Sequence, residues 1–183
     1  MVDELAMVQD IARQTQVANH CDLKETGTRS GVDAYDSHGN PYEIKTATRP
    51  SVSTGRDVGL HTLKDWRSRY WVIAIGRNLR GQGFVMDRLY VAHPSDLEPF
   101  FAKLENALLA KAAVRDEVVD AARGAGVSEQ TLEAAKSIMD RGMTTNNPHI
   151  PGKLISQLTP LDPRTAARAR RKLQVFVRKH PLP

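Results

Sequence analysis

The chain has 183 residues, of which 40% are hydrophobic and 26% charged, so its composition excludes wholesale disorder and predicts a single domain over residues 1–183. Its net charge of +5 permits a polyanionic partner without indicating one. The one cysteine, Cys21, excludes an internal disulfide framework, and no apolar run is long enough for a membrane span. We therefore expect a cytoplasmic protein without membrane contact.

The first third of the chain predicts one helix and one β-hairpin. Apolar residues recur at helical spacing in residues 1–20, and the polar residues 21–30 follow as a loop. Two short β-prone runs, 32–35 and 42–48, flank the turn-forming sequence DSHGNP, which predicts a hairpin. Residues 49–60 contain two glycines and a proline and predict a second loop.

The middle of the chain predicts buried strands and then a helix. The nearly continuous apolar run 70–75 is typical of a strand buried on both faces. Residues 84–91 continue the sheet after a polar break. Ser95 and Glu98 form an S-x-x-E pattern, which predicts a capping box and the start of a helix.

Residues 107–145 predict a helical insert with a break at Gly124–Gly126 and a second helix capped by Ser128. The stretch AARGAGVSEQTLEAAKSIM resembles a helix-turn-helix, whose second helix would enter a DNA groove. Glu129 and Glu133 would then face phosphates, which is unfavourable. We therefore favour a helical hairpin packed on the core.

The C-terminal region, residues 146–183, begins with a loop or irregular strand, NNPHIPG. A final helix is predicted to open with Asp162 as N-cap and Pro163 at the first position. The last segment carries basic side chains and no acid: Arg164, Arg168, Arg170, Arg171, Lys172, Arg178 and Lys179. They form either a solvated basic face or a clamp on DNA phosphates.

Three residues carry the most chemical information. Glu43 and Lys45 are two apart on one predicted strand and share a face, and Asp33 on the neighbouring strand can converge on them. Two carboxylates and a lysine at one spot suit a bound Mg²⁺, which prefers a few carboxylates, waters and phosphate oxygens. The D-x(9)-E-x-K pattern thus predicts metal-dependent phosphodiester cleavage. By itself the pattern is equally compatible with a charged, solvated strand.

The stretch GVDAYDSHGNPYEIK resembles the catalytic hairpin of the PvuII-like type II restriction endonucleases, in the PD-(D/E)XK nuclease superfamily. RYWVIAIGR and RLYVAHPSDLEPFFAKLE are similar to the strands and helix that follow, and NNPHIP resembles a recognition segment. The resemblance covers about residues 31–106 and 146–155. It implies an α+β (mixed α/β) fold with a central mixed sheet flanked by helices, a catalytic core at 31–106 and a dimerisation helix at 1–20.

The resemblance also implies an activity. The protein would be a homodimer that hydrolyses both strands of a short palindromic site in double-stranded DNA with Mg²⁺, leaving blunt ends. Asp33, Glu43 and the Ile44 carbonyl would bind the metal, and Lys45 would be the catalytic lysine. A cognate DNA methyltransferase would act on the same site without needing to bind the protein. A nuclease would also favour the clamp for the basic helix.

Candidate DNA-reading residues follow from the same resemblance. Asn146 and Asn147 match asparagines that contact base edges, and His149 lies in the same segment. An asparagine amide can pair with adenine, although an Asn-Asn-Pro sequence is also a plain turn. Arg56 and His61 lie in the loop that carries a histidine run in the family, and Arg56 could contact guanine or merely a phosphate.

Departures from the family pattern keep two alternatives open. Ser30 stands where the family has a glutamate, unless Glu25 supplies that acid from a shifted loop. The loop that carries a histidine run in the family has only His61 here, and the helical segment 107–145 is longer than in the family. The alternatives are a structure-specific repair or junction-resolving nuclease on the same fold, and a non-catalytic DNA-binding protein.

Overall fold

The computed structural model of the chain describes residues 2–27, 31–80 and 83–183. Its elements in chain order are α1 (Val2–Cys21), β1 (Lys24–Glu25), β2 (Ala34–Tyr35), β3 (Pro41–Ala47), β4 (Val52–Ser53), α2 (Leu60–Trp66), β5 (Tyr70–Leu79), β6 (Gly83–Ala92), the 3₁₀ helix η1 (Pro94–Leu97), α3 (Glu98–Gly124), α4 (Glu129–Arg141), β7 (His149–Ile150), α5 (Gly152–Ile155), β8 (Thr159–Leu161) and α6 (Ala166–Lys179).

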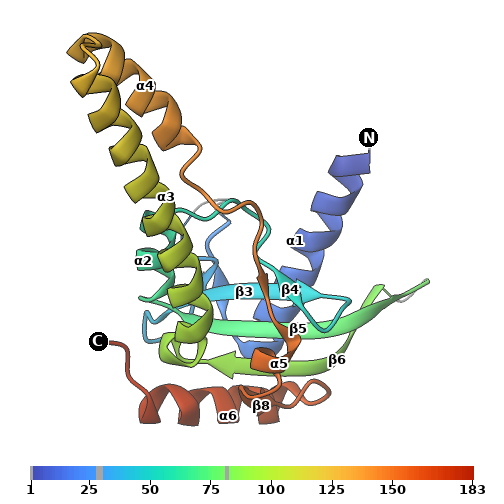
Figure 1. The fold of residues 1–183 in the computed structure, drawn as a ribbon. Coiled ribbons are helices and arrows are strands. Elements are labelled where there is room, and N and C mark those ends of the chain that lie inside the picture. Colours follow the sequence, from blue (N-terminus) through green and yellow to red (C-terminus); the bar gives the residue numbers. More distant parts are fainter. Residues whose placement is uncertain (1, 28–30, 81–82) are drawn as a thin grey trace.

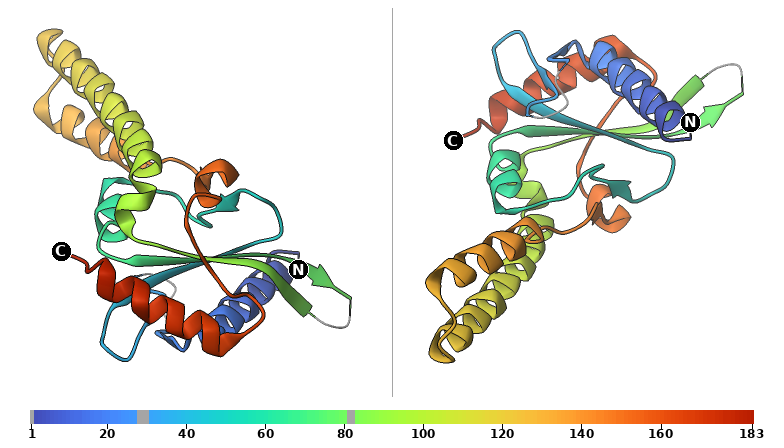
Figure 2. Two further views of the ribbon diagram at one scale, coloured as in Figure 1. Left: turned by 90° about the horizontal axis from the view of Figure 1, so that it is seen from below. Right: turned by 90° about the horizontal axis from the view of Figure 1, so that it is seen from above.

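A six-stranded mixed sheet forms the centre of the described structure, with the order β1-β2-β3-β5-β6-β8 (Figure 1). Neighbouring strands are antiparallel except β3 and β5, which run parallel and are connected through β4 and α2. Helices α1 and α6 cover one face, and α2, α3, α5 and the β4–β7 pair cover the other (Figure 2). The predicted mixed α+β fold with a central sheet flanked by helices is confirmed.

Strand β5 divides the core between the two faces. Val72 and Ala74 pack with α1 and α6, whereas Trp71 and Ile73 pack with α2 and α3. All four side chains are fully buried, so the nearly continuous apolar run reflects a strand covered on both sides. The predicted strand 70–75 is therefore confirmed, and it continues to Leu79.

The predicted hairpin is formed by β2 and β3, with Ala34 opposite Tyr42. Asp36 closes its turn, because its Oδ1 accepts the backbone N–H groups of His38 at 2.9 Å and Asn40 at 3.0 Å. Gly39 has φ +81°, a left-handed conformation that glycine adopts without steric penalty. This turn fixes the register that places the residue before β2 beside β3.

Both predicted helix starts were wrong. The capping box is formed by His93 and Asp96 rather than Ser95 and Glu98: the His93 ring accepts the Ser95 N–H, and Asp96 accepts the His93 N–H at 2.9 Å. Asp162 accepts the N–H groups of the next two non-proline residues, at 2.8 and 2.9 Å, and so caps a turn; α6 begins only at Ala166.

The insert is a helical hairpin with the predicted break at Gly124–Gly126, and Ser128 caps α4 as expected. Its two helices run antiparallel, unlike a helix-turn-helix (Figure 1). The prediction that the hairpin packs on the core was wrong. Only the first turns of α3, up to Leu108, are buried against the sheet layer, and the rest projects from the body.

In the part of the chain that the structure describes, no helix is both long enough and apolar enough to cross a membrane.

We predict that Gly76→Ala destabilises the sheet. Gly76 lies where β5 and β6 shift register, and a Cβ there would clash with the Val85 carbonyl oxygen and lie 2.9 Å from the Phe84 ring. Relief of this clash requires backbone movement, so the free energy of unfolding should fall by about 1–3 kcal/mol in urea denaturation. Gly124→Ala is the control, because its Cβ would meet nothing within 4 Å. Equal stability of the two variants would contradict this packing.

Candidate active site

The β2–β3 hairpin brings Asp33, Glu43 and Lys45 together. Lys45 Nζ lies 2.7 Å from Glu43 Oε1 and 3.9 Å from Asp33 Oδ2. Asp33 is held against the strand because its Oδ2 accepts the Ile44 backbone N–H at 2.8 Å. The local sequence causes this convergence. Glu43 and Lys45 lie on either side of Ile44 in β3, so both side chains point to the face of the sheet opposite to that of Ile44. Asp33 directly precedes β2, the strand paired with β3.

Glu43 is fully buried and surrounded by cations. Its Oε2 lies 2.9 Å from Arg69 Nη1, and its Oε1 lies 3.5 Å from Arg56 Nη2 as well as close to Lys45. Arg69 is itself buried and also donates to the Gly31 carbonyl. Three cationic side chains thus compensate a carboxylate that could not remain charged alone in the interior.

The sequence analysis missed Arg69. It precedes β5, and the parallel register pairs Tyr42 with Tyr70 and Glu43 with Trp71, so the start of β5 lies beside Glu43. An arginine directly before a run of buried residues was the available signal, since an arginine at such a position usually has an acidic partner.

Burial raises the pKa of the Asp33 carboxyl above its usual range, and the neighbouring Glu43 charge adds to this effect. Lys45, the Ile44 N–H and Arg56 act in the opposite direction without cancelling it. Asp33 therefore holds its negative charge less readily than an exposed aspartate. A further cation beside it would favour the charged form.

The oxygen donors at this site suit a hard divalent cation. Asp33 and Glu43 supply carboxylates, and the Ile44 carbonyl accepts a 3.3 Å hydrogen bond from Gln14 of α1. Within the described residues no group of three or more His, Cys, Asp or Glu side chains is placed to hold a metal ion. Two carboxylates are nonetheless a usual protein contribution to a Mg²⁺ site, which takes its other ligands from water and phosphate. Because Lys45 already contacts Glu43, it would compete with a metal ion there.

Arg56 and His61, both candidate DNA-contacting residues, differ in their exposure and in their partners. Arg56 points to the Glu43 carboxylate, and its side chain is 31% exposed. His61 lies on α2 with its side chain 88% exposed, 3.5 Å from Asp65. The His61 side chain is thus open to a ligand, whereas Arg56 already forms an ion pair with Glu43.

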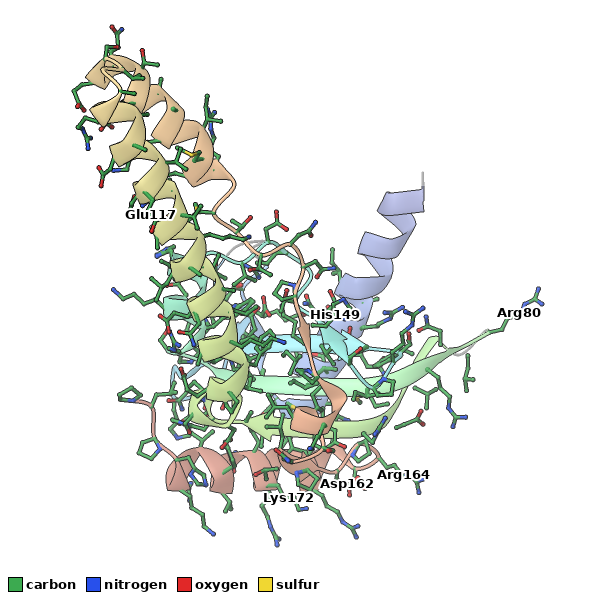
Figure 3. The ribbon with its side chains drawn as sticks, viewed as in Figure 1. Arg80, Glu117, His149, Asp162, Arg164 and Lys172 are labelled. Atoms are coloured by element: carbon green, nitrogen blue, oxygen red, sulfur yellow. The ribbon has the colours of Figure 1, made fainter. Side chains whose placement is uncertain are left out.

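The segment 146–155, the candidate recognition segment, lies on the same face of the sheet as Glu43 and Lys45, where β7 pairs with β4. The Asn147 side-chain oxygen accepts hydrogen bonds from the Ser53 hydroxyl and, at 2.9 Å, from the Gly55 N–H, so it braces the neighbouring loop. Asn146 is exposed. His149 is exposed on β7 beside a groove of about 610 Å³ that runs between α3 and α5 (Figure 3).

Two residues bear on the supporting acid that the resemblance led us to consider. Ser30 lies outside the described residues. Glu25 lies on β1 and pairs with Ala34, the residue that follows Asp33 in the sequence. Whether Glu25 serves the site therefore stays a prediction.

A mixed sheet with two carboxylates and a lysine on one hairpin is typical of metal-dependent nucleases. The family comparison agrees: the model of the restriction endonuclease PvuII family matches residues 5–118, more than half of the chain. The chain belongs to the PvuII family of type II restriction endonucleases and is a nuclease that acts on double-stranded DNA. This family generally uses a divalent metal. A search of curated proteins returned no significant match.

The extent of the family match adds to the sequence analysis. The match begins in α1, includes the β2–β3 hairpin and ends within α3. The N-terminal helix is therefore part of the family pattern. The recognition segment at 146–155 lies outside the match, so its role stays a prediction.

We predict that Arg69→Ala lowers the free energy of unfolding by about 3–5 kcal/mol, because it leaves the buried Glu43 charge poorly compensated. Arg77→Ala is a matched control: Arg77 is exposed, 3.4 Å from Asp87, and its loss should change stability by less than about 1 kcal/mol. In urea denaturation, adding Glu43→Gln to Arg69→Ala should recover part of the loss. Fully additive losses would show that the two side chains do not interact.

We predict that Asp33→Asn stabilises the fold near neutral pH. The folded-state pKa of Asp33 lies above its unfolded-state value, so its contribution to stability is present at low pH and is lost as the pH rises through the folded-state pKa. The amide keeps an oxygen for the Ile44 N–H but carries no buried charge. In thermal unfolding measured across pH, the stabilities of wild type and variant should converge at acidic pH. As the pH rises, the variant should become the more stable of the two. A variant less stable than wild type near neutral pH would contradict this account.

Proposed function

We propose that the chain is one subunit of a homodimer that hydrolyses both strands of a short palindromic DNA site with Mg²⁺ and leaves blunt ends. The single observation that supports this most is the convergence of Asp33, Glu43 and Lys45 on the sheet face that also carries the β4–β7 pair. Catalytic groups and candidate base-reading groups can then contact one duplex.

Asp33, Glu43 and the Ile44 carbonyl would hold the Mg²⁺ ion, which when bound stabilises charge on the phosphodiester and lowers the pKa of a coordinated water. Lys45 Nζ, 2.7 Å from Glu43 Oε1, would orient the attacking water or, as the neutral amine, accept its proton. Arg69 acts as a positioning residue, because its ion pair fixes the carboxylate of Glu43.

Candidate DNA contacts come from side chains on the same face. Asn146 and His149 would reach base edges from the recognition segment, and His61 from α2. Asn147 would support them indirectly, since its oxygen braces the loop after β4. Arg56 would contact either the duplex or, as here, Glu43.

A homodimer follows from a palindromic site, because each subunit must present the same chemistry to each strand. We assign the contact to α1, whose N-terminal part projects beyond the sheet and whose Ile11 is 53% exposed (Figure 1). We place the activity in the cytoplasm, beside a methyltransferase that modifies the same site. The buried Cys21 thiol suits a reducing compartment, and burial raises its pKa to about 12, which leaves it unreactive.

We predict that Lys45→Ala slows cleavage by about 10²–10⁴-fold while leaving DNA binding intact. The measurement is a plasmid and phage-DNA digest with Mg²⁺, with the product ends sequenced, beside gel shifts in Ca²⁺. The variant should also bind Ca²⁺ more tightly in calorimetry, since Lys45 no longer competes for Glu43. Lys24→Ala, an exposed lysine on β1, is the control. Wild-type cleavage by Lys45→Ala would refute the assignment.

The products of the wild-type digest separate the candidate functions. Discrete fragments sharing one blunt palindromic end support the proposal and reveal the recognition sequence. A smear would favour a structure-specific nuclease. Binding without cleavage in Mg²⁺ or Mn²⁺ would favour a non-catalytic DNA-binding protein.

A further inference from the structure

Helix α6 buries one side and exposes a basic one. Ala169, Leu173 and Phe176 pack into the core on the α1 side of the sheet. The exposed side, together with Arg164 just before the helix, is named here the outer basic face; its members are Arg164, Arg168, Arg171, Lys172, Arg178 and Lys179. The members on α6, from Arg168 to Lys179, recur at helical spacing, so they form one stripe about 17 Å long at 1.5 Å per residue.

The segment that carries this face accounts for the positive charge of the whole chain. Residues 164–179 hold seven of the 26 lysines and arginines and no acid; the remaining 19 are fewer than the 21 aspartates and glutamates. Neighbouring acids compensate little of it: Asp162 lies 3.8 Å from Arg168, and Asp22 lies 3.9 Å from Arg170, which is outside the stripe. Such a concentration of one sign on a single face favours a polyanion as partner.

The outer basic face points away from the catalytic site. Glu43 and Lys45 alternate with Ile44 on β3, and Ile44 belongs to the core layer on which α6 packs. The sheet therefore lies between α6 and the catalytic carboxylates. Figure 3 shows Arg164 and Lys172 pointing outward below the sheet and His149 above it. A clamp by α6 on the duplex held at the catalytic site, as expected from the sequence, is not compatible with this placement.

We propose that the outer basic face binds the phosphate backbone of a second segment of duplex DNA, without sequence preference. Duplex DNA is the polyanion that this nuclease acts on, and about 17 Å of duplex carries roughly 10 phosphate charges, of which those on one side would face the stripe. A membrane surface is a poorer partner, because a membrane-bound helix exposes large apolar side chains, whereas α6 buries Leu173 and Phe176. Non-specific contacts of this kind would retain the enzyme on DNA between specific encounters.

The test uses the full chain with Arg168→Gln, Arg171→Gln and Lys172→Gln combined, and a charge-conserving control with Arg168→Lys and Arg171→Lys. All three positions are exposed, so neither variant should unfold. Beads carrying a long duplex that lacks the cleavage site are incubated with protein and then with a labelled second duplex, without divalent metal. Wild type and the lysine control should capture the labelled duplex in a salt-sensitive manner, and the glutamine variant should lose capture.

Cleavage of a short duplex carrying the site is measured in parallel and should be unchanged in the glutamine variant. Undiminished capture by that variant overturns the proposal. Loss of capture by the lysine control overturns the claim that the positive charge of the face is sufficient for binding to the phosphate backbone. Loss of short-duplex cleavage shows that the face contacts the catalytic duplex and also overturns it, as does stronger capture of RNA or of phosphatidylserine vesicles. Capture needs no metal, so its outcome is distinct from failure of the cleavage proposal.

Discussion

A single buried carboxylate constrains this structure more than any other group. Glu43 has no solvent exposure, so its charge must be compensated within the protein. The compensating cations come from separate segments: Lys45 from β3 itself, Arg56 from the loop after β4, and Arg69 from the residues before β5. Each of these segments is fixed by its contact with Glu43. The parallel register of β3 and β5 brings Arg69 to Glu43, so the strand pairing also arranges the candidate active site.

The charged groups of the candidate active site carry a desolvation cost, which the apolar layers on either side of the sheet offset. Burial penalises the charge of Asp33, and Glu43 adds repulsion. The compensating stabilisation comes from β5, whose side chains contact helices on both faces, and from the Trp66–Trp71 edge contact at 5.1 Å. This division of roles explains how a charged cluster can persist beside fully buried tryptophans.

The sequence predicted those elements whose pattern is local. Turn residues between two β-prone runs predicted the β2–β3 hairpin, and the apolar run predicted β5, because each signal spans only a few neighbouring residues. Strands β1, β4, β7 and β8 have two or three residues each, too few to show alternation. Arg69 required the parallel register of β3 and β5, which no local pattern encodes. The amphipathic pattern of the α3–α4 insert predicted helices, but such a pattern does not specify whether a helix covers the core or projects from it.

The same insert leaves the body of the protein and returns to it at neighbouring points. Lys111 of α3 donates a 2.8 Å hydrogen bond to the Thr144 carbonyl, and Thr145 exchanges backbone hydrogen bonds with Val58 at 2.8 and 2.9 Å. The segment between Lys111 and Thr144 is thus an insertion whose two ends are held together by hydrogen bonds that do not depend on its length. Evolution, or an engineer, could shorten it to a tight turn or graft another module at the Gly124–Gly126 bend without displacing the strands on either side.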